Sequence, residues 1–521
     1  MDSIPVELNF KIISEAGQNF RQYMAFTLTR FPSFSSSDEN LSFTNSDYDL
    51  CEYQNNFAVK RDQRSLLLRR ISIPGIKRST SKGCVKLVAD EPTFSKEILI
   101  ANLSSLNSQQ ILTMRMITCL ENKYIQQIAA DEQIVSAILG AFSNCANENI
   151  SIEAQIFLVT MIIKIFPLSS ESTKANITDE TIFSVMNIFS NNFVSNENNS
   201  GNELQLYPSA LKLCQVFSKN SVYARDALIS FAVHSEIINF AMKCTNKDLR
   251  YECLYTVLNI LSNSGKIESE SLNEIVDQLF ELLNSEDADQ IAIVMSILCE
   301  ITNREPTIIP MFYERGLYTQ AMNVLESPQI ASDALHLIGN ICVSKTSYKE
   351  KLLESGLFEK LIVLLNNERF TSDVYWVLSN FLESVPHLIL PKINPNFISM
   401  SINIADQTGF DIKREVAYFI STLIICLNNE IAIQLISEPI IELIAEMLNS
   451  GVEPAMIRCI DAFYKLFHAA NEKNKSVELI SLFEGSEVAK QLTEIMQSGL
   501  TNLIMVERAN ILLSQIENFS G

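Results

Sequence analysis

The sequence predicts an all-α fold, a solenoid built from repeated helical units. Three observations lead to this prediction. Glycine and proline are scarce in the 521 residues, at 14 each, whereas residues with good helix propensity abound, which favours helices over sheets. Similar apolar helical segments recur about every 40 residues over much of the chain. These segments carry none of the strand signals that leucine-rich or WD40 repeats require.

Residues 1–56 form the first segment in chain order. They hold eight acidic and three basic residues, and the stretch 31–49 is rich in Ser, Asn and Asp. This composition predicts a disordered or weakly ordered N-terminal region.

The next segment, 57–86, is basic. It holds nine Lys or Arg residues against one Asp, whereas 87–521 holds 28 basic and 52 acidic residues. Such asymmetry indicates a segment that pairs with the body of the chain or with an acidic partner. The net charge of −21 argues against nucleic acid as a direct ligand, because binding to phosphates needs clustered Lys and Arg. A basic partner fits the body better.

The cysteines and the apolar runs bear on the compartment. The 11 cysteines occur singly, without a C-x-x-C pair, which predicts buried free thiols in a reducing compartment. Residues 1–20 lack the pattern of a signal peptide, and apolar runs such as 156–166 are shorter than the roughly 18 residues of a membrane helix. We expect a soluble intracellular protein without a membrane partner.

The segment 87–521 repeats with a period near 40 residues. ERGLYTQAMNVL at 314–325 recurs as ESGLFEKLIVLL at 354–365, and ASDALHLIGNICV at 331–343 aligns without a gap with TSDVYWVLSNFLE at 371–383. A period of this length with helical patterning alone matches armadillo or HEAT repeats. Since one unit cannot bury its apolar face by itself, stacked units form one continuous core. About ten units fit, and the segment is expected to be one solenoid.

Each of the clearer units contains two positions that lie one helical turn apart, and we call each such pair a rung. Side chains at i and i+4 share a helix face, and Trp376, the only tryptophan in the chain, is followed at this spacing by Asn380. The rungs that recur in register are Ile156/Thr160, Leu211/Gln215, Tyr255/Asn259, Ser296/Glu300, His336/Asn340, Trp376/Asn380 and Tyr418/Thr422. Asp373 and Glu415 stand three places before the aromatic residue of the last two rungs.

Rungs on the last helix of successive repeats would form parallel rows along the concave face of a solenoid. Asparagine amides donate and accept hydrogen bonds, so they can hold the backbone of an extended peptide without reading its sequence. Aromatic rings between them can seat lysine stems and attract the ammonium group, and surrounding acidic residues favour basic peptides. The predicted ligand is therefore an extended peptide rich in Lys and Arg.

Several of these segments resemble the importin-alpha (karyopherin alpha) family of nuclear-import adaptors, with this chain as a divergent member. The segments are ALHLIGNI, DVYWVLSNF, KREVAYFIST and the terminal pattern FEGSEVAKQL…QIENF. The basic stretch VKRDQRSLLLRRISIP at 59–74 resembles the second half of that family's importin-beta-binding helix. The likeness covers roughly 57–520. It implies a right-handed armadillo-repeat superhelix of about ten repeats behind a flexible N-terminal arm.

The resemblance implies a nuclear import adaptor. Such a protein binds the basic nuclear localisation signals of cargo proteins in its concave groove, shuttles between cytoplasm and nucleus, and is returned by an exportin. It performs no catalysis and needs no cofactor. The basic segment implies a link to importin-beta, or an autoinhibitory position in the acidic groove of the chain itself, through Lys60, Arg61, Arg64, Arg69 and Arg70.

The family has a major cargo site over its second to fourth repeats and a minor one over its sixth to eighth. In the major region of this chain two of three tryptophans are replaced by aliphatic residues, and Asn259, beside Tyr255, is the one asparagine that remains. In the minor region the family usually has an arginine in place of His336. We expect cargo to bind mainly through the sixth to eighth repeats, by His336, Asn340, Asp373, Trp376, Asn380, Glu415, Tyr418 and Thr422. Tyr255 and Asn259 are the expected cargo-binding residues of the major region.

Other interpretations stay open at this point. Tyr255 and Tyr418 can be ordinary core aromatics, and a single tryptophan such as Trp376 is more typical of a core than of a site. An armadillo scaffold for signalling or cytoskeletal assembly is the alternative function. The four histidines are scattered, and the chain lacks P-loop, G-x-S-x-G and H-E-x-x-H motifs, so we expect no enzyme.

Overall fold

The computed structural model describes residues 96–103, 122–144, 151–175, 177–191, 203–262, 269–497 and 503–520. Within these ranges the regular structure is helical and contains no strand, so the predicted all-α fold is confirmed. No helix in them combines the length and the apolar character that crossing a membrane requires. The N-terminal region 1–56 and the basic segment 57–86, with Lys60, Arg61, Arg64, Arg69 and Arg70, lie outside the described residues.

Most repeats consist of a short first helix, a second helix and a third helix. The first helices are α5 (Asn122–Ala130), α8 (Glu171–Ala175), α11 (Val222–Ser230), α16 (Ile309–Glu314), α19 (Thr346–Glu354), α22 (Pro386–Ile389), α25 (Asn429–Ala432) and α28 (Ser476–Gly485). The second helices are α6 (Glu132–Ser143), α9 (Asp179–Asn191), α12 (Val233–Lys243), α14 (Ser269–Leu283), α17 (Leu317–Val324), α20 (Leu357–Leu364), α23 (Pro395–Gln407), α26 (Glu438–Glu446) and α29 (Val488–Gln497).

The third helices carry the rungs. They are α7 (Ile152–Ile165), α10 (Glu203–Asn220), α13 (Lys247–Ser262), α15 (Ala288–Arg304), α18 (Ala331–Asn340), α21 (Glu368–Ser384), α24 (Phe410–Cys426), α27 (Glu453–Glu472) and α30 (Leu503–Ser520). A further helix, α3 (Lys96–Leu103), precedes α5. Short 3₁₀ turns follow several helices: η3 (Phe166–Leu168), η4 (Pro306–Ile308), η5 (Ile341–Val343), η6 (Leu390–Lys392), η7 (Ile433–Leu435) and η8 (Met447–Asn449).

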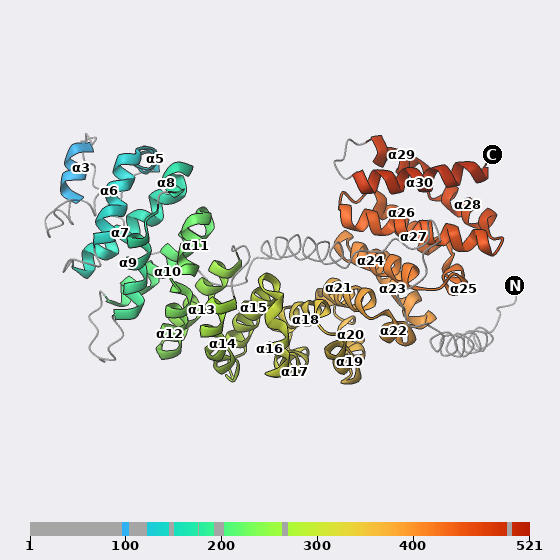
Figure 1. Ribbon diagram of the computed structural model, residues 1–521, viewed down its shortest axis with the longest axis horizontal. Helices are drawn as coiled ribbons and strands as arrows, with labels where there is room; N and C mark the ends of the chain where they lie inside the picture. The colour runs from blue at the N-terminus through green and yellow to red at the C-terminus, as the bar shows by residue number, and fades with distance from the viewer. Residues whose placement is uncertain are drawn as a thin grey trace, which may run out of the picture. The chain divides into compact units, whose positions relative to one another are not determined.

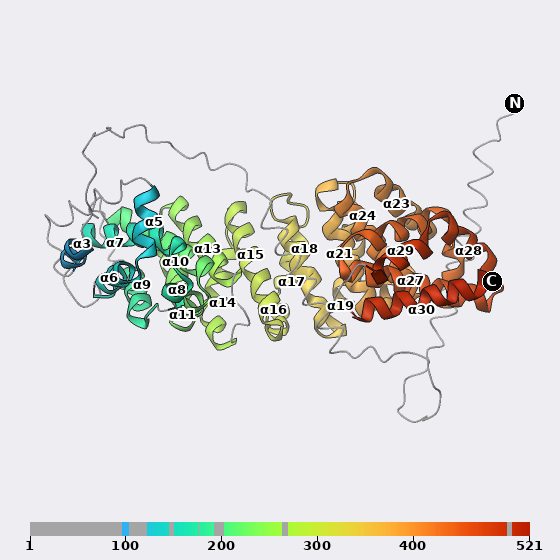
Figure 2. The same ribbon diagram turned by 90° about the horizontal axis from the view of Figure 1, so that it is seen from above.

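The described residues belong to two compact units, an N-terminal unit that ends at Ile308 and a C-terminal unit that begins at Ile309. In the N-terminal unit the third helices α7, α10, α13 and α15 pack on one another in chain order, and the second helices α6, α9, α12 and α14 form another row (Figure 1). In the C-terminal unit α18, α21, α24, α27 and α30 pack on one another in chain order (Figure 1), and Figure 2 shows the same helices from above. One period of the sequence therefore corresponds to one step along a row of third helices.

Aromatic side chains fix neighbouring repeats of the C-terminal unit to each other. The ring centroid of Phe419 on α24 lies 5.6 Å from that of Tyr375 on α21 and 5.8 Å from that of Phe397 on α23. The hydroxyl of Tyr375 donates to Oγ of Ser401 at 2.8 Å, so this buried polar group is satisfied. Burial raises the pKa of Tyr375 to about 12, and the phenol stays neutral. The packing holds α21 against α24 and thus positions the rungs that both helices carry.

The turn between the first and second helix has the same backbone conformation in several repeats. Gly316 and Gly356, which recur in the sequence, have φ angles of +80° and +88° and directly precede α17 and α20. Glycine adopts this left-handed region without the strain that a Cβ atom brings. Ala232 before α12 and Glu487 before α29 adopt it as well, with φ of +54° and +53°. The turn therefore belongs to the repeat and persists where glycine is absent.

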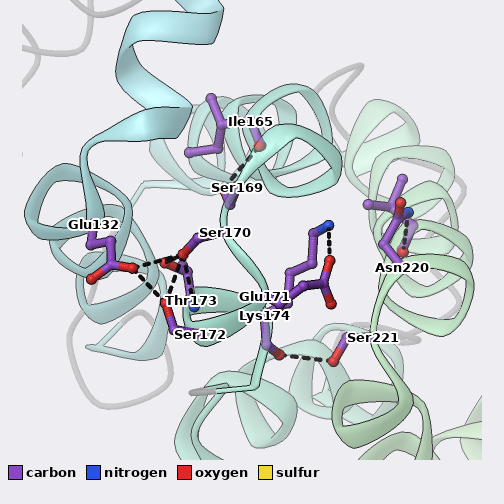
Figure 3. A network of polar contacts seen from close by, with 11 residues as sticks. Glu132, Ile165, Ser169, Ser170, Glu171, Ser172, Thr173, Lys174, Asn220 and Ser221 are labelled. Atoms are coloured by element: carbon purple, nitrogen blue, oxygen red, sulfur yellow. Dashed lines mark hydrogen bonds and ion pairs between the residues drawn. The ribbon is translucent and has the colours of Figure 1, made fainter.

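Polar contacts connect adjacent repeats of the N-terminal unit. Figure 3 shows Ser170 and Ser172 directed at Glu132, the first residue of α6, and Oγ of Ser170 donates to Oε1 of Glu132 at 2.7 Å. The hydrogen bonds from Ser172 and Ser170 lower the pKa of Glu132. One repeat further on, Oγ of Ser221 donates to the carbonyl oxygen of Lys174 at 2.8 Å. These bonds fix the two ends of the short helix α8.

The cysteines in the described part of the chain are free thiols, and most of them are buried. Burial raises the pKa to about 12 for Cys214, Cys342, Cys426 and Cys459. A thiol with such a pKa is protonated at neutral pH and therefore a poor nucleophile. In these positions the cysteines act as small apolar residues of the core, as the sequence predicts.

One lysine is buried in the C-terminal unit. Lys349 on α19 is 4% exposed, and its ammonium group donates to the carbonyl oxygen of Cys342 at 3.1 Å. Burial lowers the pKa of Lys349. Below its folded-state pKa the charge therefore costs stability, and this cost is relieved as pH rises through the folded-state pKa toward about 10.4, the value of an unfolded lysine.

Lys349→Met should raise the stability at pH 7 by about 1 kcal/mol, because it removes a buried charge and keeps the apolar stem. The lost hydrogen bond to Cys342 offsets part of the gain. Thermal denaturation at pH 7 and pH 9.5 measures the effect, and the advantage of the variant should narrow at the higher pH. Lys351→Met, at an exposed position of the same helix, is the control and should change little. A destabilised Lys349→Met variant would show that the hydrogen bond outweighs the cost of burial.

Candidate functional site

The predicted rungs all fall on third helices, at corresponding places. The N-terminal unit carries Ile156/Thr160 on α7, Leu211/Gln215 on α10, Tyr255/Asn259 on α13 and Ser296/Glu300 on α15. The C-terminal unit carries His336/Asn340 on α18, Trp376/Asn380 on α21 and Tyr418/Thr422 on α24. Because α18, α21 and α24 pack side by side, the last three rungs are neighbours in space.

The indole of Trp376 lies directly on α18. A Cβ atom added to Gly339 would stand 2.1 Å from Cζ3 and 2.5 Å from Cη2 of Trp376, so the approach depends on glycine. The imidazole of His336 meets the indole edge-on, with ring centroids 5.5 Å apart and an interplanar angle of 87°, which is a favourable arrangement of two rings. Trp376 is 7% exposed. The preceding third helix therefore sets the position of this aromatic side chain.

Asp373 joins the same two helices one turn before Trp376. Its Oδ2 accepts a hydrogen bond from Oγ of Ser332 at 2.6 Å, and its Oδ1 lies 3.1 Å from Nε2 of His336. Asp373 is buried, so both contacts are shielded from water. The result is a carboxylate beside an aromatic pair, an environment that favours an ammonium or guanidinium group.

The asparagines of these rungs are buried, at 2% exposure for Asn340 and 1% for Asn380. Within the part of the chain that the structure describes, Nδ2 of Asn380 is a buried donor without a hydrogen-bond partner. An unsatisfied buried donor costs about 1–3 kcal/mol. A carbonyl oxygen of a bound peptide placed beside Nδ2 would recover that free energy.

Several other rungs use their polar groups within the protein. Nε2 of Gln215 donates to Oγ1 of Thr256 at 2.9 Å, and Oε1 of Gln215 accepts from Nζ of Lys212 at 3.3 Å. Asn259 is exposed and Tyr255 half-buried, and Nδ2 of Asn259 donates to the carbonyl oxygen of Tyr255 at 2.8 Å. The hydroxyls of two further rungs donate to the backbone four residues earlier, Thr160 to Ile156 and Thr422 to Tyr418. These donors therefore gain less from a ligand than Asn380 does.

The hydroxyl of Tyr418 takes part in a cluster of charged groups. It donates to Oε1 of Glu383 on α21 at 2.7 Å and accepts from Nε of Arg458 on α27 at 3.2 Å. Nη2 of Arg458 donates to the same Glu383 oxygen at 2.8 Å, and Cζ of Arg458 lies 5.3 Å from the centroid of the Tyr418 ring. Tyr418 thus carries a cation on its ring and a carboxylate at its hydroxyl.

Glu415 supplies a further carboxylate beside Tyr418 in the sequence. Its side chain is 14% exposed, and its Oε1 lies 3.4 Å from Nη2 of Arg414. The arginine is shared, because Nη1 of Arg414 donates to Oδ1 of Asp411 at 3.0 Å. The two predicted acids therefore differ, since Asp373 binds a neighbouring helix and Glu415 contacts its own.

Glu383 and Arg458 are not among the residues predicted from the sequence. The period does contain a signal for Arg458, which follows Tyr418 by 40 residues and so stands at the next rung position, on α27. Glu383 follows Trp376 by seven residues, two helical turns along the same face. Extending the series of rungs by one repeat would have identified Arg458, and extending the Trp376/Asn380 rung by one helical turn would have identified Glu383.

A scan against protein-family models and a search of curated proteins give no match. Among solved structures, an engineered protein of the Northeast Structural Genomics Consortium is similar over 81% of this chain and 98% of its own, with 15% identity and a TM-score of 0.54. A designed armadillo repeat protein has 19% identity over 46% of this chain and 98% of its own, with a TM-score of 0.37. A structure of computationally designed armadillo repeat proteins for modular peptide recognition has 19% identity over 46% of this chain and 98% of its own, with a TM-score of 0.36.

The likeness to the engineered protein concerns the fold alone. With the three-helix units and the row of third helices, the predicted all-α armadillo-repeat fold is confirmed. This fold is consistent with a scaffold that binds other proteins.

Proposed function

We propose that this chain is an adaptor that binds basic, extended segments of other proteins along the third helices of its C-terminal unit. The observation that carries the proposal is the environment of Trp376. An aromatic ring with Asp373 beside it suits the stem and the charge of a lysine or arginine. Asn380 adds a buried donor that has no acceptor among the described residues, which suits a peptide carbonyl.

The contrast between the two units supports this location. Gln215 and Asn259 in the N-terminal unit already have hydrogen-bond partners in the protein, and Leu211 is fully buried and aliphatic. In the C-terminal unit the aromatic residues Trp376 and Tyr418 stand on adjacent helices, each with a carboxylate nearby. The last three rungs, those of the sixth to eighth repeats, therefore provide more of the aromatic and acidic groups that a basic peptide binds.

Within this proposal the adaptor is of the importin-alpha type. Its ligands are the nuclear localisation signals of cargo, its basic segment 57–86 binds importin-beta or the chain's own acidic body, and it shuttles between cytoplasm and nucleus with an exportin for return. The support is the resemblance of 59–74 and of the repeats, together with the charge difference between 57–86 and the body. It performs no catalysis, needs no cofactor, and binds neither nucleic acid nor membrane directly.

A pull-down on immobilised importin-beta tests the link to import. The full chain should be retained, and deletion of 57–80 should reduce capture by about tenfold or more, because complementary charge drives this contact. A matched variant keeps the length and replaces Lys60, Arg61, Arg69 and Arg70 by alanine, and it should behave like the deletion. Equal capture of the full chain and both variants, or capture of none, would favour the rival function, a scaffold for signalling or cytoskeletal assembly.

A further inference from the structure

Arg458 stands where the repeat would place the aromatic residue of the next rung. It lies on α27, 40 residues after Tyr418. Its side chain points back along the row of third helices, because Cζ lies 5.3 Å from the Tyr418 ring centroid and Nη2 lies 2.8 Å from Oε1 of Glu383. Three consecutive third helices, α21, α24 and α27, thus supply one residue each to a single cluster.

The cluster is shielded from water. The side chain of Glu383 is 4% exposed and that of Arg458 is 19% exposed. A buried carboxylate requires a charge partner and hydrogen bonds, and Glu383 has both, from Arg458 and from the hydroxyl of Tyr418. The carboxylate of Glu383 therefore holds the guanidinium of Arg458 on the Tyr418 ring. Without Arg458 this carboxylate would be a buried charge without its cation, which is destabilising.

These contacts are the ones that a basic side chain of a ligand would make at this rung. A cation over a tyrosine ring and against a carboxylate gains from both groups. We infer that Arg458 occupies the place of a ligand cation at Tyr418, and that it restricts recognition of basic residues to the neighbouring Trp376 rung. The inference rests on the proposed function and makes Arg458 a specificity-determining residue.

The consequence is a limit on the ligand. A basic residue is accepted beside Trp376, where His336 and Asp373 are the neighbours. A second basic residue at Tyr418 must first separate Arg458 from Glu383. Peptides whose residues beyond the Trp376 position are neutral should bind as well as peptides that carry a further lysine there.

Three synthetic peptides can measure this limit. Packed helices lie about 8–10 Å apart and an extended chain advances about 3.3 Å per residue, so neighbouring rungs are roughly three residues apart. The short probe has a Lys-Arg pair within Gly and Ser. The long probe adds one lysine three residues before the Lys-Arg pair and one three residues after it, so the result does not depend on the direction in which the peptide binds. The charge control carries the same two added lysines six residues from the pair.

The readout is the ratio of the dissociation constants of the charge control and the long probe, from fluorescence anisotropy. In the natural protein this ratio should be near one. Arg458→Met should raise it about fivefold, because the ring and the carboxylate then become available to the added lysine. Glu383→Gln combined with Arg458→Met should remove the gain, since the incoming cation no longer meets a carboxylate.

An unchanged ratio of dissociation constants in a folded Arg458→Met protein would overturn the inference. A ratio that stays raised in the double variant Glu383→Gln/Arg458→Met would overturn it as well. If Arg458→Met does not fold, Arg458→Lys replaces it, keeps the charge and weakens the double contact. Its ratio should rise about twofold, and no rise would overturn the inference equally. Binding of the short probe tests the proposed function separately, through Trp376→Ala/Asn380→Ala.

Discussion

Replacing Trp376 and Asn380 together by alanine should weaken the binding of a single-cluster basic peptide about 30-fold. The loss combines about 1 kcal/mol for the contact of a lysine with the indole and about 1 kcal/mol for the hydrogen bond of the Asn380 amide. Isothermal titration calorimetry with a Lys-rich peptide measures it. Circular dichroism of the variant checks the fold, because Trp376 also packs on α18.

The matched control is Tyr255→Ala/Asn259→Ala on α13 of the N-terminal unit. The amide of Asn259 already donates to the carbonyl oxygen of Tyr255. Replacing this hydrogen bond by one to a peptide therefore adds little binding free energy. We expect about a threefold loss at most, the effect of one exposed contact of about 0.5 kcal/mol. A larger loss from this pair than from Trp376/Asn380 would mean that the peptide binds in the N-terminal unit.

Gly339→Ala should move the indole of Trp376 and destabilise the C-terminal unit. The new Cβ atom would lie 2.1 Å from Cζ3 of Trp376, and overpacking of this kind costs about 1–3 kcal/mol. The higher helix propensity of alanine contributes about 1 kcal/mol in the opposite direction, which offsets only part of the cost of the clash. We expect a lower melting temperature together with weaker peptide binding, because the ring no longer stands beside Asp373.

The single tryptophan of the chain makes this test direct. Emission from Trp376 reports one environment, and in Gly339→Ala the emission maximum should shift to longer wavelength and iodide should quench it more strongly. Gly140→Ala on α6 is the control, since no atom lies within 4 Å of its added Cβ, and it should be neutral or slightly stabilising. Native emission and native melting in Gly339→Ala would show that α18 does not fix the ring.

The period of the sequence predicts the fold and the register of the rungs well. Each step of 40 residues is one repeat, and stacked repeats place equivalent residues on equivalent helices, so Tyr255, Trp376 and Tyr418 all lie on third helices. The recurrence of Gly316 and Gly356 marks the turn before the second helix. At Ala232 and Glu487 the same left-handed turn occurs without glycine, so a search for recurring glycines does not find it there.

Contacts between helices are harder to predict. The hydrogen bonds of Asp373 with Ser332 and His336 depend on the rotation of α21 against α18, which no periodicity specifies. The repeat gives the positions of Glu383 and Arg458, but it does not reveal that both side chains meet the hydroxyl of Tyr418, because that contact joins three repeats. Among the described residues Asn380 retains an unsatisfied donor while Asn259 does not, although both stand at the same place in the repeat.

The bond between Arg458 and Glu383 also bears on how the array unfolds. Most contacts between its third helices join residues about one repeat apart, as the 37 residues from His336 to Asp373 do, and an array coupled in this way melts from its ends, one neighbour at a time. Arg458 and Glu383 are 75 residues apart, and their bond passes over α24 to join α21 with α27. Fraying of α27 must therefore break a shielded ion pair, and this longer-range coupling makes the repeats of α21, α24 and α27 lose their structure together, as one cooperative block.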